Sequence, residues 1–259
     1  MTEILAVCRH VGRAFSGGGE SHVSVLNDVN CEIREGARIA LTGPSGSGKT
    51  TLLHILGGLD RPTSGIVEWP GLGPAERLRP RLIGVVFQAP SLFPALTVAQ
   101  NVDLPAILAD EDLPPDYSRD LLSCFGLGEL ADKMPEELSG GQAQRVAMVR
   151  ALALRPKLVL ADEPTGQLDG VTAQFFMDAV LEYLANTSAA LIVATHDQAV
   201  AARMATRWTM DHGQFRCGQP VLEPAWWSFS GFGASLPTAS PGPPARRRAS
   251  RSQWRFWRC

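Results

Sequence analysis

The sequence predicts an α/β fold with a parallel sheet covered by helices on both faces. One observation is a glycine-rich loop at residues 43–50 that stands between a strand pattern and a helix pattern. The other is an alternation of short apolar runs and helical stretches after residue 157, which is typical of strands joined by helices in a parallel sheet. The chain has 259 residues, 45% of them hydrophobic, so it can bury a substantial core.

The first part of the chain has β-type patterns separated by glycine turn signals. These patterns predict strands at residues 4–7, 23–26, 29–33 and 37–41. We expect an antiparallel β region that leads into the glycine-rich loop. After the loop, the pattern predicts a helix that begins near Lys49 and, beyond a break at residues 57–65, strands at 66–69 and 82–87.

The middle of the chain changes to helical character. From about residue 95 to 154, helical stretches are interrupted by prolines and glycines and contain almost no β-branched clusters. We expect a helical subdomain inserted into the α/β core. The alternation then returns, with strands at 158–161, 190–194 and 208–210 and helices at about 171–185 and after Asp197.

The last segment, residues 217–259, is rich in proline and serine and ends in a cluster of arginines. Its composition predicts disorder. The arginines could bind anionic lipid, nucleic acid or nothing, and a solvated tail is the favoured interpretation, so no nucleic acid partner is expected. The formal net charge of the whole chain is −2, which hides an acidic body and a basic tail.

Other bulk features exclude several classes. The five cysteines are scattered and contain no C-x-x-C pair, so they do not predict a metal site. No run of 18 apolar residues is present, and the N-terminus does not have the pattern of a signal peptide. We therefore expect a chain that neither spans a membrane nor is secreted.

The glycine-rich loop carries chemistry of its own. It fits G-x-x-x-x-G-K-[ST] and consists of Gly43, Pro44, Ser45, Gly46, Ser47, Gly48, Lys49 and Thr50, with Thr51 directly after it. Glycines let backbone N–H groups approach phosphates, and the following helix adds the positive end of its dipole. Lys49 is expected to reach the β- and γ-phosphates of a nucleotide and Thr50 to bind Mg²⁺. A flexible Gly/Ser turn is the alternative, and the flanking strand and helix weigh against it.

Two carboxylates follow the apolar run at residues 158–161. Asp162 comes at the C-terminal end of this predicted strand, where open α/β sheets bind ligands, and is expected to hold Mg²⁺. Glu163 is next along the chain and is expected to act as the general base that activates water. A solvated acidic turn is the alternative, and the phosphate-binding loop upstream favours the functional interpretation.

A second glycine-bearing turn, Leu138-Ser139-Gly140-Gly141-Gln142, precedes a predicted helix. With it, the sequence resembles the ATP-binding subunits of ABC transporters, whose signature is L-S-G-G-Q. The resemblance covers roughly residues 4–216 and implies an ABC-type ATP-binding domain over residues 1–216 with a P-loop NTPase core. Residues 57–65 and 162–169 are most similar to the branch that includes lipoprotein-releasing, macrolide-exporting and cell-division-associated ATPases.

The resemblance also implies roles for single residues. Gln88 is the Q-loop residue, which senses Mg²⁺ and water, and His196 is the switch histidine, which contacts the γ-phosphate and orients the base. Asp169 lies in the D-loop, and Phe15 is expected to stack on adenine, although it could equally be a core residue. The implied ligands are ATP and Mg²⁺, with Ser139, Gly140, Gly141 and Gln142 approaching the γ-phosphate of a partner subunit.

The implied partners are a second ATPase subunit in a head-to-tail dimer and a separate membrane permease. The permease is expected to dock near residues 88–96 and to place this chain in the cytoplasm, on the inner face of the cell membrane. The expected function is ATP hydrolysis that powers export or the handling of envelope lipids and lipoproteins. The alternatives are an ATPase that regulates a membrane complex of the cell-division type without transport, and a soluble ABC ATPase unrelated to transport.

Overall fold

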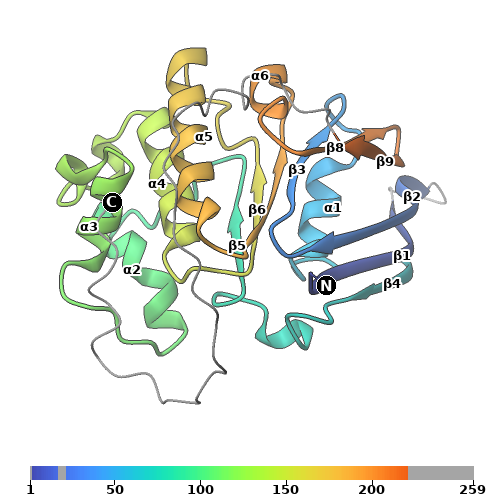
Figure 1. Cartoon of the computed structure of the whole chain (residues 1–259), viewed down its shortest axis with the longest axis horizontal. Coiled ribbons are helices and arrows are strands. Elements are labelled where there is room, and N and C mark those ends of the chain that lie inside the picture. The colour runs from blue at the N-terminus through green and yellow to red at the C-terminus, as the bar shows by residue number, and fades with distance from the viewer. Residues whose placement is uncertain (1, 17–21, 221–259) are drawn as a thin grey trace, which may run out of the picture. The chain divides into compact units, whose positions relative to one another are not determined.

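The computed structural model describes residues 2–16 and 22–220. They form one nine-stranded sheet in the order β4-β1-β2-β9-β8-β3-β7-β6-β5 (Figure 1). The strands are β1 Ile4–Ser16, β2 His22–Arg34, β3 Arg38–Thr42, β4 Ser64–Glu68, β5 Ile83–Val86, β6 Leu158–Asp162, β7 Ala190–Ala194, β8 Thr206–Asp211 and β9 Gln214–Pro220.

The sheet has a parallel part and an antiparallel part. Strands β8, β3, β7, β6 and β5 pair in parallel, whereas β1 pairs antiparallel with β2 and β4. The predicted α/β fold with an antiparallel N-terminal region is therefore confirmed. The parallel strands read as apolar runs because they are covered on both faces, and every residue of β6 and β7 is buried.

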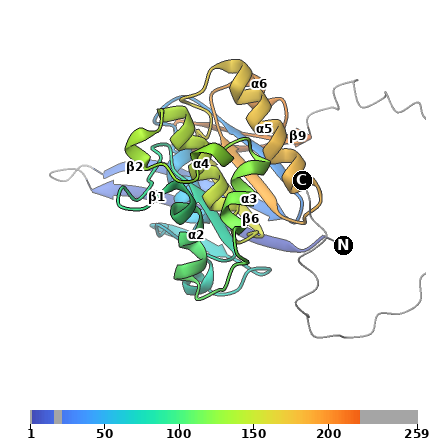
Figure 2. The ribbon, with the colours of Figure 1, turned by 90° about the vertical axis from the view of Figure 1, so that its left-hand side faces the viewer.

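Six α-helices and three short 3₁₀ turns accompany the described strands. The helices are α1 Lys49–Leu56, α2 Val98–Leu108, α3 Tyr117–Cys124, α4 Gly140–Leu152, α5 Gly170–Ala185 and α6 Gln198–Ala201, and the 3₁₀ turns are Ala75–Arg77, Gly128–Leu130 and Pro135–Glu137. Figure 2 shows α2, α3 and α4 grouped in front of the sheet. The segment at residues 95–154 is thus helical, as its composition predicted.

The sheet separates two apolar clusters. Along β6, Leu158 and Leu160 face a cluster that includes α1 and the antiparallel strands, whereas Val159 and Ala161 face a cluster with α2 to α6. This division follows from the two-residue period of a strand, which points successive side chains to opposite faces. Helix α1, which follows the phosphate-binding loop, contributes to the first cluster, and Leu138 at the signature turn packs against the second.

Helix α4 packs closely against β5. A Cβ atom at Gly84 would lie 2.3 Å from the carbonyl oxygen of Ala151 near the end of α4, and 3.2 Å from Cγ of Pro156. Only glycine leaves room for this approach of helix backbone to strand. Gly84 therefore fixes where the C-terminal end of α4 sits on the sheet.

Several predicted boundaries differ from the structure, among them that of the first strand, which was predicted at residues 4–7 and runs over Ile4–Ser16. The runs at residues 23–26 and 29–33 belong to one strand, β2, which continues through Asp28 with a positive φ of 51°. Strand β9 was not predicted, and its last residues lie in the segment from 217 onward that was assigned to the tail. The rest of that tail, with its arginine cluster, lies outside the described residues.

Candidate active site

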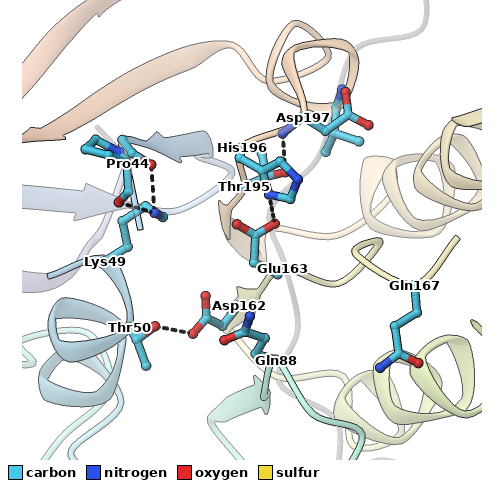
Figure 3. A network of polar contacts seen from close by, with 12 residues as sticks. Pro44, Lys49, Thr50, Gln88, Asp162, Glu163, Gln167, Thr195, His196 and Asp197 are labelled. Carbon is cyan, nitrogen blue, oxygen red and sulfur yellow. Dashed lines mark hydrogen bonds and ion pairs between the residues drawn. The ribbon is translucent and has the colours of Figure 1, made fainter. Parts of the chain in front are cut away.

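Four loops that carry predicted site residues follow neighbouring parallel strands at the same edge of the sheet. The glycine-rich loop follows β3, Gln88 follows β5, Asp162 ends β6 with Glu163 directly after it, and His196 follows β7. The strand order β3-β7-β6-β5 makes these loops neighbours in space although they are far apart in sequence. Figure 3 shows Lys49, Thr50, Gln88, Asp162, Glu163 and His196 together.

The glycine-rich loop wraps around the lysine ammonium. Lys49 Nζ donates to the carbonyl oxygens of Gly43 at 2.8 Å and Pro44 at 3.0 Å. Helix α1 begins at Lys49, so Thr50 and Thr51 lie in its first turn and its N-terminal N–H groups are directed toward the loop. Ser47 Oγ is buried and has no hydrogen-bond partner among the described residues. A buried hydroxyl of this kind can bind a polar ligand atom.

Thr50 and Asp162 form the oxygen-donor pair of the site. Thr50 Oγ1 donates to Asp162 Oδ2 at 2.5 Å. Burial raises the pKa of the Asp162 carboxyl, and the hydrogen bond from Thr50 acts in the opposite direction. A carboxylate beside a hydroxyl, both next to a phosphate-binding loop, is the kind of oxygen set that Mg²⁺ uses together with substrate phosphates. Figure 3 places the side chain of Gln88 beside this pair.

Glu163 is held in an unusual backbone conformation. Its φ is +47°, in the left-handed region, which costs a non-glycine residue about 1–2 kcal/mol. Its N–H donates to the carbonyl oxygen of Ala194 at 2.9 Å, and the carboxylate Oε2 lies 2.9 Å from His196 Nδ1. The side chain of Glu163 is 13% exposed and that of His196 is 76% exposed. An exposed imidazole therefore contacts a carboxylate that is mostly buried.

The signature turn caps α4. Ser139 Oγ accepts from the backbone N–H of Gln142, and the Gln142 side chain accepts from the N–H of Ser139, which completes a capping box. A Cβ at Gly140 would lie 2.0 Å from Gln167 Oε1, so the turn packs against the segment after Glu163. Among the described residues, no hydrogen bond joins Ser139 to the phosphate-binding loop. The signature turn thus does not form part of the phosphate-binding site of its own chain.

The structure also places Asp169 and Phe15, the two other residues that were predicted to lie near a nucleotide. Asp169 is the N-cap of α5, and its carboxylate accepts from the N–H groups of Val171 and Thr172. Hydrogen bonds from Thr172 lower the pKa of Asp169. Phe15 is 43% exposed, so it is not a core residue. The roles of Asp169 and Phe15 toward a nucleotide stay predictions.

Phe15 has a partner that the sequence did not reveal. The guanidinium carbon of Arg13 lies 4.3 Å from the centre of the Phe15 ring, and Arg13 forms a two-point ion pair with Asp60, with Nε to Oδ2 at 2.9 Å and Nη2 to Oδ1 at 3.0 Å. This bidentate pair holds the arginine plane against one face of the ring. The opposite face of the Phe15 ring is the one on which the adenine of a nucleotide is expected to stack.

A second residue was also missed. Gln144 is a polar residue on the buried face of α4, among Val146, Ala147 and Met148. It is 1% exposed and contacts the loops of the site. The sequence feature that pointed to Gln144 was a glutamine at a helix position where the period of about 3.6 residues places an apolar side chain.

Comparison with known proteins identifies the family. The sequence profile of the family described as "ABC transporter" matches residues 26–166. The chain belongs to this family. The lipoprotein-releasing system ATP-binding protein LolD of Legionella pneumophila strain Paris is 42% identical over 213 residues, which cover 79% of this chain and 93% of LolD. LolD of Pseudomonas fluorescens is 43% identical over 206 residues, which cover 76% and 90% of the two chains.

Solved structures agree with this assignment. The ATP-binding cassette MJ0796, as a dimer in a post-hydrolysis state bound to ADP and Pi, matches with a TM-score of 0.77 and 33% identity over 85% of this chain and all of that one. CbiO1 from Clostridium perfringens, part of an ABC transporter complex, matches with a TM-score of 0.69 and 29% identity over 83% and 88% of the two chains.

The chain is therefore an ATP-binding and ATP-hydrolysing subunit of the ABC transporter class with a P-loop NTPase core. Of the helices within the described ranges, none combines the length and the apolar character needed to cross a bilayer. The predicted fold, family branch and enzyme class are confirmed.

Proposed function

We propose that this ABC ATPase hydrolyses ATP with Mg²⁺ in a head-to-tail dimer and drives a separate membrane permease that releases lipoproteins or related envelope lipids. The observation that carries the ATPase part is the convergence of four loops on one sheet edge, with Glu163 Oε2 2.9 Å from His196 Nδ1. The lipoprotein part is supported by the relatives named LolD. Attachment to a permease would place the chain at the inner face of the cell membrane.

The residues at the site divide the reaction among them. Lys49 and the loop N–H groups bind the phosphates, while Thr50, Asp162 and Gln88 would hold Mg²⁺, which when bound would neutralise phosphate charge. Glu163 takes the proton of the attacking water, and His196 keeps the carboxylate directed at it. The base is 13% exposed, so few solvent molecules compete with the attacking water.

A second chain is needed to complete the site. Ser139 to Gln142 lie on the N-terminal turn of α4 and contact Gln167 and Leu168 rather than the phosphate-binding loop of their own chain. In a head-to-tail pair the N-terminus of α4 would face the γ-phosphate bound by the partner, where fixed N–H dipoles and the Ser139 hydroxyl stabilise its charge.

The permease is expected to contact the loop that joins Gln88 to α2. Asn101, fully buried, holds this loop through bonds with the backbone N–H and carbonyl oxygen of Phe93 and the carbonyl oxygen of Leu96. Phe93 itself is 54% exposed. A rigid loop that presents an aromatic ring suits the reception of a helix from another protein.

Glu163→Gln tests the proposal. The amide cannot accept the proton of water, so phosphate release should fall by about 100-fold or more, while ATP binding persists and an ATP-bound dimer accumulates in gel filtration. Glu182→Gln on the exposed surface of α5 is the matched control and should hydrolyse ATP like the wild type. Retained steady-state hydrolysis by Glu163→Gln would remove Glu163 as the base.

A further inference from the structure

Gln144 joins the helix that starts at the signature turn to the residues of the hydrolysis site. Its Nε2 donates to the carbonyl oxygen of Glu163 at 2.6 Å and lies 3.5 Å from the carbonyl oxygen of Gln88. Its Oε1 accepts from the backbone N–H of Gln167 at 3.0 Å. One planar carboxamide therefore contacts the base, the Q-loop and the segment against which the signature turn packs.

The position is costly for a polar side chain, which points to a specific task. Gln144 is 1% exposed and lies on the apolar face of α4. A buried amide loses its hydration and is tolerated only when its donors and acceptors are paired. An apolar residue would fill the same volume without this cost, so packing alone does not account for a glutamine here.

The group that Gln144 holds is under strain. Glu163 has a φ of +47°, and its carbonyl oxygen accepts from Gln144 Nε2 and, at 3.1 Å, from the N–H of Gly166. Its own N–H is fixed by Ala194 on β7. A strained conformation persists only when the surroundings determine it, and here the surrounding bonds come from β7, the following turn and α4.

We propose that Gln144 is a positioning residue for ATP hydrolysis: its carboxamide fixes the strained backbone of Glu163 and so aims the carboxylate at the attacking water. This inference rests on the proposed role of Glu163 as the base. It also ties the base to α4, the helix whose first turn would face the ATP of the partner subunit. Each hydrolysis site is thereby connected, inside one chain, to the turn that serves the other site.

Gln144→Met in the full chain is the direct test. Methionine has nearly the same length and volume but can neither donate to Glu163 nor accept from Gln167. We expect kcat for ATP to fall by about 10- to 100-fold, because misplacement of a reacting group by about 1 Å costs that much. KM for ATP should change by less than about twofold, since Lys49 and the phosphate-binding loop are untouched.

The matched control is Gln174→Met on the exposed surface of α5, which should keep wild-type kcat and KM. If Gln144→Met does not fold, Gln144→Asn replaces it, because asparagine is one methylene shorter and cannot span both bonds. A kcat within about twofold of wild type in a folded Gln144 variant would overturn the inference.

A double-mutant cycle separates positioning from a general loss of structure. If Gln144 acts through Glu163, Gln144→Met should leave the residual single-turnover rate of Glu163→Gln unchanged, whereas independent damage to the fold would lower it further. A further loss in the double variant would overturn the inference. The failure of the proposed function is a different result: Glu163→Gln alone would then retain hydrolysis, whatever Gln144→Met does.

Discussion

Asp162 carries a conflict between stability and binding. The residue is 5% exposed, and burial raises the pKa of its carboxyl. Ionisation therefore costs the folded chain free energy: the carboxyl favours the fold below its unfolded pKa of about 3.9, and this contribution is lost as the pH rises through the folded value. At neutral pH the charged form is maintained at a cost to the free energy of unfolding, which a bound cation would offset.

Asp162→Asn should remove that cost. The amide oxygen still accepts from Thr50, so the nucleotide-free variant should have a higher free energy of unfolding than wild type at pH 7, while Mg²⁺-dependent hydrolysis is lost. The difference should shrink as the pH falls toward about 4, because the wild-type carboxyl becomes neutral. Urea unfolding at both pH values measures it.

The control for this comparison is the exposed Asp112. Asp112→Asn should change the free energy of unfolding by less than about 0.5 kcal/mol at either pH. An Asp162→Asn variant that is no more stable than wild type at pH 7 would contradict the account of the buried charge.

At single positions, sequence motifs located the residues but not their conformation. The letters Asp162-Glu163 predicted a metal ligand and a base, yet the positive φ of Glu163 and its bond to Gln144 depend on strands and helices distant in the chain. The Arg13–Asp60 pair beside Phe15 was hidden for the same reason, since 47 residues separate its members. The spacing of residues in a motif predicts which side chains act together, whereas contacts such as those of Gln144 and of the Arg13–Asp60 pair form only when distant segments fold together.

At the level of elements, substitutions can separate the observed role of Ser139 as a helix cap from its proposed role near the γ-phosphate. As the N-cap of α4 it accepts from the N–H of Gln142, and Ser139→Ala should lower the free energy of unfolding by about 1 kcal/mol. Ser139→Asp keeps a capping oxygen but adds a negative charge toward the expected γ-phosphate. It should match wild type in thermal unfolding and lose at least about 10-fold in ATP hydrolysis.

Measuring both variants distinguishes the tasks. If Ser139→Asp hydrolyses ATP at the wild-type rate, the signature serine does not approach phosphate, and its role is confined to the helix cap. If it is as unstable as Ser139→Ala, the capping bond is not what holds the first turn of α4.

The elements were predicted best where the sequence had a single strong signal. Strands β6 and β7 and helix α5 were found nearly to the residue, because they are long apolar or periodic runs. Strand β9 was missed because it contains few apolar residues and is held by tertiary pairing. It pairs antiparallel with β8 and, where Gln214 lies opposite Asn27, parallel with β2. Strand β2 was divided in two because its irregular pairing with β1 interrupts the alternation.

At the scale of the whole molecule, the signature turn and the sheet are connected through α4. Gly84→Ala would bring a methyl group to 2.3 Å from the carbonyl oxygen of Ala151, so the end of α4 must move away from β5. We expect a loss of about 1–3 kcal/mol in the free energy of unfolding. ATP hydrolysis should also fall while ATP binding is kept, although Gly84 lies in β5 and belongs neither to the phosphate-binding loop nor to the signature turn.

Val85→Ala is the control for this prediction, because it weakens β5 on the opposite face, where Val85 lies near Gly57 and α1. It should lower stability without a specific loss of hydrolysis. Equal losses of kcat in the two variants, measured at a temperature where both are folded, would show that hydrolysis follows stability and not the placement of α4.

The C-terminal end of α4 contacts β5 at Gly84, so a change in the tilt of the helix there would move the signature turn at its other end. The helix has 13 residues, so its arm is about 20 Å long, and a tilt of about 5° at the sheet displaces the signature turn by about 1.7 Å. The absence of a side chain at Gly84 therefore permits the position of α4 on the sheet, and with it the position of the signature turn. In a screen for loss of transport, substitutions at this silent-looking glycine should be recovered alongside those in the phosphate-binding loop.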